Sequence, residues 1–357
     1  MADQLHDGDA RAQPMLEVER LVRRLGPGFT LGPIDLSIGA RQIVCLVGHS
    51  GCGKSTLLRL IAGIERPDSG TVRLDGKALA GPGVFVEPEK RNIGFVFQDY
   101  ALFPHLTVKQ NILFGLRKRP REEARARVAM LLELTALTAM AGRYPHMLSG
   151  GEQQRAALAR ALAPEPSIVL MDEPFSNLDR DLRERVRHET IALLRRTATT
   201  AVIVTHDPEE ALSTGDRIVL MKSGQIVQNG TGRDLHDRPA DRYAAEFFST
   251  FNRVPGIYRG GALHTALGAF PCRLDLAEGS EALAFIRPQA VCPCMALDGL
   301  SGAVRSRSFR GEIEQLELDV EGLTAPLVMR TTQRLNIQDG KLRFRIDPET
   351  VLAFTAA

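Results

Sequence analysis

The sequence has no excess charge of either sign, no long apolar run and no regular cysteine pattern. Its 45 basic and 43 acidic side chains give a net charge of +2, so charge does not predict a nucleic-acid partner. No apolar run approaches the ~20 residues of a membrane span. The five cysteines lie at irregular positions, which indicates reduced thiols and not a disulfide framework. We therefore expect neither a secreted, a membrane-spanning nor a fibrous protein.

The pattern of apolar residues changes along the chain. Residues 1–14 are polar and predict a flexible leader without the apolar core of a signal peptide. Over residues 15–251, short β-branched runs alternate with helical stretches, which predicts an α/β domain with a largely parallel sheet. Over residues 252–357, short alternating segments between glycines and prolines predict a small all-β domain, an OB-like barrel.

The periodicity also places individual elements. The expected strands of the α/β part are residues 42–47, 93–97, 168–171, 201–205 and 217–220. Its expected helices are 55–62, 108–116, 121–134, 151–163, 180–196 and 208–212. In the last part of the chain, we expect strands at 282–287, 302–309, 313–320 and 341–346.

A phosphate-binding loop is predicted between an apolar strand and an amphipathic helix. The chain there fits G-x-x-x-x-G-K-[ST], and we expect ATP to contact Gly48, His49, Ser50, Gly51, Cys52, Gly53, Lys54, Ser55 and Thr56. The glycines permit a tight loop whose N–H groups face the phosphates. Lys54 would reach the β- and γ-phosphates, and the Ser55 hydroxyl would hold Mg²⁺. The alternative, a strand–helix turn that binds nothing, is disfavoured by this context.

Two carboxylates follow another buried strand. Asp172 and Glu173 come after residues 168–171 and before Pro174, at the sheet edge where open α/β folds bind ligands. Asp172 would hold Mg²⁺, and Glu173 would polarise the water that attacks the γ-phosphorus.

A second anion-binding surface is predicted where a long helix begins with two glycines. Ser149 and Glu152 form a capping box, which does not explain Gly150 and Gly151, because each costs about 1 kcal/mol of helix propensity. Their first turn leaves N–H groups bare at the positive end of the helix.

These motifs together resemble the ATP-binding-cassette (ABC) ATPases. Residues 148–155, L-S-G-G-E-Q-Q-R, are similar to the signature motif of that family, which lies in a helical subdomain. Gln98 resembles the Q-loop glutamine, a further magnesium ligand, Asp179 the D-loop aspartate, and His206 the switch histidine. The resemblance covers residues 15–251. It implies a homodimer in which the signature residues complete the partner's ATP site.

The histidine precedes a clear helix start. Asp207 is the expected cap, Pro208 the first helical residue and Glu210 the capping-box glutamate. This places His206 at the carboxyl edge of the sheet, beside Asp172 and Glu173 if their strands are neighbours. The resemblance then implies that His206 senses the γ-phosphate.

Within the family, the chain resembles subunits of bacterial binding-protein-dependent importers. Residues 285–288, F-I-R-P, match a recurrent start of their regulatory barrel, and residues 100–108 form an apolar stretch that we interpret as a partner surface. The resemblance implies a separate membrane permease with a substrate-binding protein, and a peripheral location on the cytoplasmic face of the inner membrane. Residues 141–146 and 156–164 look most like ferric-ion uptake ATPases. Polyamine, molybdate, sulfate and thiamine importers are alternatives.

Two other classes of function remain to be compared with the importer. Soluble ABC ATPases of nucleic acid or the ribosome carry coiled-coil insertions, two cassettes or basic arms, and the single cassette here has none of these. A regulator without turnover is disfavoured because Ser149, Glu173 and His206 are all present.

Three details depart from the family or stay open. In the family, an aromatic side chain stacks on adenine, and its position falls on Leu25 in this chain. The chain has no tryptophan to take this role, and Phe29 takes it only if its loop is shifted. Cys52 is expected to be exposed in its loop and open to alkylation. Cys292 and Cys294 could be metal or redox ligands, but free thiols are the preferred interpretation, because a structural zinc site needs four ligands.

Overall fold

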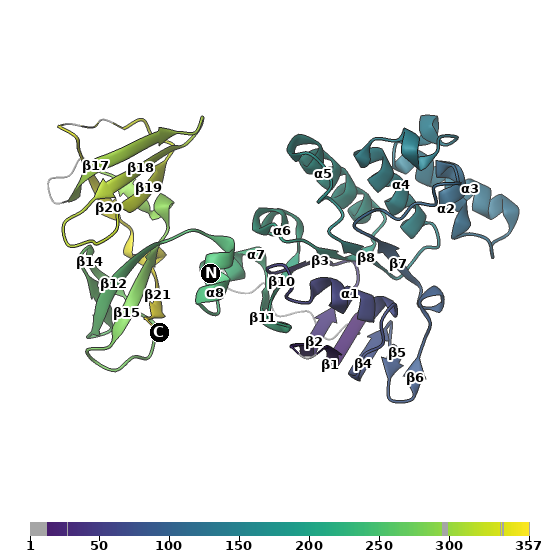
Figure 1. The fold of residues 1–357 in the computed structure, drawn as a ribbon, viewed down its shortest axis with the longest axis horizontal. Coiled ribbons are helices and arrows are strands. Elements are labelled where there is room, and N and C mark those ends of the chain that lie inside the picture. The colour runs from purple at the N-terminus through teal and green to yellow at the C-terminus, as the bar shows by residue number, and fades with distance from the viewer. Residues whose placement is uncertain (1–12, 27, 295–298, 336, 338, 357) are drawn as a thin grey trace, which may run out of the picture. The chain divides into compact units, whose positions relative to one another are not determined.

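The computed structural model describes residues 13–26, 28–294, 299–335, 337 and 339–356. The chain divides into two compact units, one reaching to Ala240 and one from Asp241 (Figure 1). The second unit opens with helix α8 (Arg242–Phe248), and strand β12 (Asn252–Arg259) then begins at the first residue of the predicted second domain.

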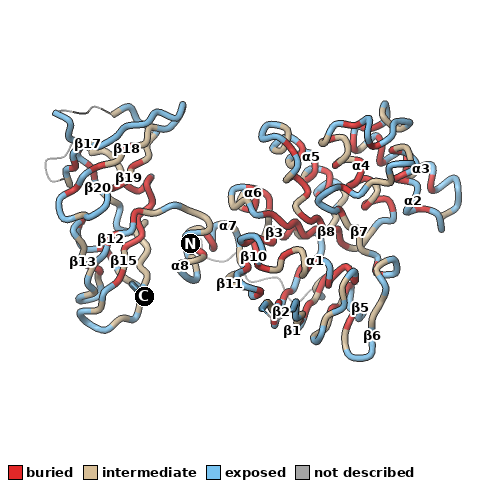
Figure 2. Tube along the Cα trace, viewed as in Figure 1, coloured by how far each residue is buried: buried red, intermediate tan, exposed pale blue. Residues whose placement is uncertain are grey.

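A six-stranded sheet forms the centre of the first unit. Its strand order is β11-β10-β3-β9-β8-β7, parallel throughout except for β11 at one edge. Every residue of β3, β8 and β9 is buried (Figure 2), because helices cover both faces of such a sheet. This confirms the predicted parallel sheet. The bounds are β3 (Ile43–Val47), β7 (Ile93–Val96), β8 (Ile168–Asp172), β9 (Thr200–Val204), β10 (Arg217–Lys222) and β11 (Gln225–Gly230).

The predicted helices of this unit are confirmed within two residues at each end. Helix α2 contacts α3 and α4, α4 contacts α5, and these four helices form the helical part of the unit (Figure 1). The bounds are α1 (Lys54–Ala62), α2 (Val108–Phe114), α3 (Arg121–Leu134), α4 (Gly150–Leu162), α5 (Arg180–Arg196) and α6 (Pro208–Thr214), followed by α7 (Gly232–Asp237).

A second, antiparallel sheet in this unit was not predicted. Its order is β2-β1-β4-β5-β6, and its buried leucines, isoleucines and valines join one core with α1 and the parallel strands. In β1 the buried positions are Leu16, Val18 and then Leu21, because a bulge between Val18 and Leu21 breaks the alternation. The bounds are β1 (Leu16–Leu25), β2 (Phe29–Ile38), β4 (Ser69–Leu74), β5 (Lys77–Gly81) and β6 (Val84–Phe85).

After α8, the second unit is built of β-strands and is barrel-like, as predicted for this part of the chain. Two five-stranded antiparallel sheets, β14-β13-β12-β15-β21 and β16-β20-β17-β18-β19, share a single hydrophobic core. Its other strands are β13 (Ala262–Thr265), β14 (Gly268–Pro271), β15 (Glu281–Ile286), β16 (Val291–Pro293), β17 (Leu300–Phe309), β18 (Glu314–Asp319), β19 (Leu327–Thr331), β20 (Lys341–Ile346) and β21 (Leu352–Thr355).

Candidate nucleotide site

The candidate site lies along the carboxyl edge of the parallel sheet. Strands β3, β9, β8 and β7 are consecutive neighbours, so the segments that follow them meet at one edge. The phosphate loop follows β3, and His206 follows β9. Asp172 is the last residue of β8, Glu173 comes directly after it, and Gln98 follows β7. The strands that lead to His206 and Glu173, β9 and β8, are therefore neighbours, as the predicted placement of His206 requires.

The phosphate loop needs glycine at its two ends. Gly48 has φ +149°, and a Cβ there would lie 2.3 Å from the Met221 carbonyl oxygen. Gly53 has φ +104°, and a Cβ there would lie 2.7 Å from Leu31 Cδ1. No side chain caps α1 at Gly53, so the N–H groups of its first turn remain available for an anion.

Lys54 and Cys52 lie inside this loop. The buried Lys54 ammonium donates to the carbonyl oxygens of Gly48 at 2.7 Å and His49 at 3.2 Å. Cys52 is only 5% exposed, and its Sγ lies 3.8 Å from Lys54 Nζ. The expectation of an exposed thiol was therefore wrong. Cys52 has glycines on both sides in the sequence, which suggested exposure, but the folded loop wraps around its side chain.

Ser55 and Asp172 form an oxygen pair suited to magnesium. The Ser55 hydroxyl donates to Asp172 Oδ1 at 2.7 Å, although 117 residues separate them. Burial raises the pKa of Asp172, and the Ser55 hydrogen bond and the charge of Arg59 oppose that rise. A hydroxyl and a carboxylate beside a phosphate loop are hard oxygen ligands, which Mg²⁺ prefers. The residues present therefore fit the ion.

Gln98 is held toward the loop that follows Glu173. Its Nε2 donates to Ser176 Oγ at 3.4 Å, and Asn177 Nδ2 donates to its backbone carbonyl at 2.9 Å. The printed sequence gave no signal for these two contacts. The magnesium role of Gln98 stays a prediction.

Glu173 and His206 face each other across neighbouring strands. His206 Nδ1 lies 3.2 Å from Glu173 Oε2. The Glu173 backbone has φ +45°, and its N–H donates to the Val204 carbonyl of β9 at 3.1 Å. A carboxylate and an imidazole are thus held together at the edge where the phosphate loop ends.

The glutamate expected to close the α6 capping box does something else. Asp207 caps α6 by accepting from the N–H groups of Glu209 and Glu210. The Glu210 carboxylate instead accepts a hydrogen bond from the Thr205 hydroxyl at 2.8 Å. The capping-box interpretation of Glu210 was wrong, since the Asp207 N–H donates to Thr205 Oγ1 and not to Glu210.

The signature segment begins α4 with the predicted capping box. Ser149 Oγ accepts from the Glu152 N–H, and Glu152 Oε2 accepts from the Ser149 N–H at 2.7 Å. This second hydrogen bond lowers the pKa of Glu152. A Cβ at Gly150 would lie 2.9 Å from Leu178, and one at Gly151 3.0 Å from Val186. Close packing against α5 and the residues just before it is therefore a second reason for the two glycines.

The remaining predicted positions have structural surroundings of their own. Asp179 caps α5, and its Oδ1 accepts from the Leu182 N–H at 3.0 Å. Leu25 is 37% exposed and pairs with Phe29 in the β1–β2 hairpin. The Phe29 ring packs near the loop, 3.3 Å from where a Cβ on Gly53 would lie. The roles predicted for Asp179 and Leu25 stay predictions.

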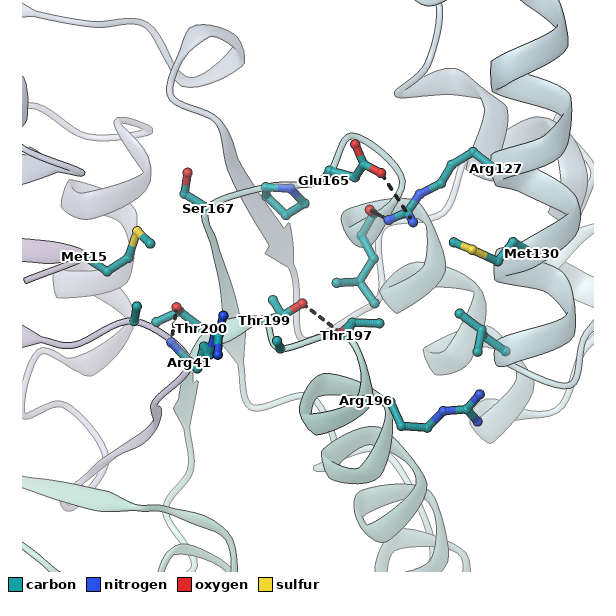
Figure 3. A pocket seen from close by; sticks show the side chains of 15 residues that line it. Met15, Arg41, Arg127, Met130, Glu165, Ser167, Arg196, Thr197, Thr199 and Thr200 are labelled. Atoms are coloured by element: carbon teal, nitrogen blue, oxygen red, sulfur yellow. Dashed lines mark hydrogen bonds and ion pairs between the residues drawn. The ribbon is translucent and has the colours of Figure 1, made fainter.

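A cavity lies at the opposite edge of the sheet. It has a volume of about 690 Å³ and is lined at the strand starts by Arg41, Ser167 and Thr200 and by Arg127 and Met130 of α3 (Figure 3). Figure 3 shows Arg127 paired with Glu165, at 3.5 Å. Ligands of open α/β sheets bind at the carboxyl edge, so this cavity is not part of the nucleotide site.

A parallel sheet with a phosphate loop, an oxygen pair for magnesium and a carboxylate–imidazole pair defines a P-loop ATPase. Residues 31–176 match the family described as ABC transporter. A sulfate/thiosulfate import ATP-binding protein of Chromobacterium violaceum is 45% identical over 88% of this chain and 86% of its own. The chain therefore belongs to the ABC transporter ATP-binding proteins. In the described part of the chain, none of the helices combines the length and the apolar composition that a membrane span requires.

Other relatives carry other names. An Fe(3+) ions import ATP-binding protein of Streptomyces coelicolor is 42% identical over 86% of this chain and 88% of its own. A putrescine transport ATP-binding protein of Escherichia coli is 44% identical over 69% of this chain and 65% of its own. The solved dimeric ATP-binding cassette MJ0796, bound to ADP and Pi, is 33% identical with a TM-score of 0.54 and covers 61% of this chain and 99% of its own.

Proposed function

We propose that this chain is the ATP-hydrolysing subunit of an importer. The observation that carries the proposal is the meeting of Lys54, the Ser55–Asp172 pair and the Glu173–His206 pair at one edge of the sheet. In this proposal the loop N–H groups and Lys54 bind the phosphates of ATP. Mg²⁺, held by Ser55 and Asp172 with Gln98, would neutralise phosphate charge. Glu173 orients the attacking water, and His206 contacts the γ-phosphate.

The proposed working unit is a homodimer. Gly150 and Gly151 form the first turn of α4, where the backbone N–H groups suit an anion. Within the described residues, no hydrogen bond of Ser149, Gly150 or Gly151 reaches the phosphate loop. A second copy, arranged head to tail, would place them on its partner's γ-phosphate. The dimeric cassette among the solved relatives supports this arrangement.

We propose that a membrane permease docks beside α2. The fully buried Asn111 side chain accepts a hydrogen bond from the Phe103 N–H and donates one to the Phe103 carbonyl oxygen. These two bonds fix the loop before α2. The rings of Phe103 and Phe114 contact each other in a tilted arrangement, with centroids 4.4 Å apart. The exposed large apolar side chains of this part of the chain include Phe97, Leu113, Phe114, Tyr144 and Met147. The permease, with its substrate-binding protein, would hold the subunit on the cytoplasmic face of the inner membrane.

The proposed cargo is an inorganic ion. Ferric iron is the candidate given by residues 141–146 and 156–164, and it is supported by the relative named for Fe(3+) ions. Sulfate or thiosulfate is the second candidate, because the relative with 45% identity carries that name.

Two measurements test this function. Solubilised membranes should yield this chain together with a multi-spanning permease, and the complex should hydrolyse ATP; co-purification with nucleic acid or ribosomes would contradict the proposal. Deletion of the gene should then reduce uptake of labelled ferric iron. Unchanged iron uptake with reduced sulfate uptake would transfer the cargo to the oxyanion, and a reduction of polyamine uptake alone would contradict the inorganic-ion proposal.

A further inference from the structure

A buried carboxylate lies directly behind the Glu173–His206 pair and has no part in the chemistry proposed above. Glu210 on α6 is 5% exposed. Its Oε2 accepts from Thr205 Oγ1 at 2.8 Å, and its Oε1 has no hydrogen-bond partner among the residues that the structure describes. Burying a half-satisfied carboxylate costs stability, so packing alone gives no reason for it.

The Glu210 carboxylate controls the backbone on both sides of His206. Because an ionised carboxylate only accepts, Thr205 must donate to it. The Thr205 oxygen is then oriented to accept from the Asp207 N–H, at 3.1 Å. The Thr205 N–H is itself fixed to the Leu46 carbonyl of β3 at 3.1 Å. The residues before and after His206 are thus tied to a single hydroxyl, whose direction Glu210 sets.

The same carboxylate faces the loop that follows Glu173. Glu173, His206, Arg183 and Glu210 line a cavity of about 10 Å³, close to the room that one water molecule needs. Across it, Arg183 Nη2 donates to the carbonyls of Ser176 at 3.3 Å and Leu178 at 2.9 Å. Burial raises the pKa of Glu210, while the Thr205 hydrogen bond and the charges of Arg187 and Arg183 oppose that rise.

We propose that Glu210 is a positioning residue for ATP hydrolysis: through the Thr205 hydroxyl it holds His206 against Glu173, and across the small cavity it faces the arginine that supports residues 176–178. In this proposal Glu210 touches neither the nucleotide nor the attacking water. It acts on the rate of the chemical step and leaves the binding of ATP unchanged, because the phosphate loop is held by separate contacts. The proposal rests on the ATPase function above.

The test compares four variants of the full chain, with kcat per folded protein and the Kd for ATP measured for each. Glu210→Ala should lower kcat about tenfold or more and change the Kd for ATP less than about twofold. Glu210→Gln keeps an acceptor for Thr205 and should restore kcat to within about threefold of the parent. Thr205→Val removes the hydroxyl from the other side and should lower kcat as Glu210→Ala does. Glu209→Ala, an exposed glutamate one position earlier, should behave as the parent.

The double variant Glu210→Ala/Thr205→Val distinguishes positioning from a general loss of stability. Two residues that act through one hydrogen bond are non-additive, so the double variant should be no slower than the slower single variant. The proposal would be overturned if the reductions in kcat of the two single variants multiplied in the double variant. It would also be overturned if Glu210→Gln were as slow as Glu210→Ala, or if Glu210→Ala kept the parent kcat. If Glu210→Ala does not fold, Thr205→Val and Glu210→Gln decide by the same criteria. A parent chain without ATPase activity would instead contradict the proposed function itself.

Discussion

At the scale of single residues, the backbone of Glu173 sets the geometry of the site. A non-glycine residue with positive φ is strained by about 1–2 kcal/mol. Its conformation at φ +45° is retained by its own N–H bond to Val204 and by the Ser176 hydroxyl, which donates to its carbonyl at 3.0 Å. Such strain is common where a side chain must point at a substrate. Here it turns the carboxylate out of the strand direction and toward His206.

Glu173→Gln should keep ATP binding and lose turnover. The amide has the same shape and can still contact His206. It is, however, a poor group for orienting the attacking water and for accepting a proton from it. We expect kcat to fall about 10²–10⁴-fold, the usual contribution of a general base, with the Kd for ATP nearly unchanged. Steady-state ATPase assays and nucleotide titration measure the two quantities.

Lys54→Ala provides the contrast to that variant. Loss of one charged phosphate contact removes about 1.5–3 kcal/mol, so nucleotide affinity itself should weaken about 10- to 100-fold. If Glu173→Gln hydrolyses ATP at the parent rate, another group activates the water.

The base of the nucleotide should be recognised weakly. Leu25, at the family's position for the aromatic ring, cannot stack on adenine, and base–aromatic stacking is worth about 1–3 kcal/mol in nucleic-acid complexes. We expect ATP and GTP to bind within about tenfold of each other, Leu25→Tyr to lower the KM for ATP, and Phe29→Ala to change it little. A large loss of ATP affinity in Phe29→Ala would show that Phe29 is the stacking residue.

At the scale of elements, the sequence predicted those helices and strands in which the pattern of apolar residues is regular. The parallel strands are continuous apolar runs that end in chemically distinct residues, so β3, β8 and β9 and their site residues could be placed from the sequence. The antiparallel sheet could not, because the bulge in β1 shifts the buried positions from Val18 to Leu21. Glu210 was misassigned because its spacing from Asp207 fits a capping box, and spacing does not show which acceptor the side chain reaches.

Asp216 joins the starts of two central strands. Its carboxylate accepts from the Ile43 N–H at 2.8 Å and from both terminal nitrogens of Arg195, at 2.8 and 2.5 Å. Partial burial alone would raise the pKa of Asp216, but the Arg195 and Ile43 hydrogen bonds outweigh it and hold that pKa below its usual range. Asp216→Asn should lower the free energy of unfolding by about 0.5–1 kcal/mol at pH 7, since the pair is partly exposed. Denaturant melts measure the difference.

The sign of the pH dependence follows from the lowered pKa. A carboxylate with a lower pKa when folded stabilises the protein above its unfolded pKa of about 3.9. That contribution is lost as the pH falls from about 4 through the folded pKa. The difference between parent and Asp216→Asn should therefore be full at pH 7 and shrink below about pH 4. An equal difference at pH 3 and pH 7 would contradict a role of the charge.

At the scale of the whole molecule, one chain contains only part of the proposed reaction site. Lys54, Ser55, Asp172, Glu173 and His206 meet at the carboxyl edge of one sheet, whereas Ser149 opens a helix that packs on α5. The Ser149 N–H and hydroxyl donate to Glu152, whereas the first-turn N–H groups of Gly150 and Gly151 face outward from the start of α4. In the proposed dimer, these N–H groups bind the γ-phosphate held by a second chain. ATP should therefore be the bridge between two copies, and hydrolysis should release them.

The last prediction tests this bridge in the hydrolysis-deficient background of Glu173→Gln. With ATP that variant should become a stable dimer by light scattering, and with ADP it should stay a monomer. Adding Ser149→Arg, which places a bulky side chain on the shared surface, should abolish the ATP-dependent dimer and change the Kd for ATP less than about threefold, since no contact within one chain is lost at the phosphate loop. Thr231→Arg is the matched control, because Thr231 caps α7 through the same kind of capping box with Asp234, and it should leave the dimer intact.

Two outcomes would contradict this prediction. If Ser149→Arg weakened the binding of ATP to a monomer, the signature residues would act on the nucleotide of their own chain. If the dimer persisted, they would lie outside the interface.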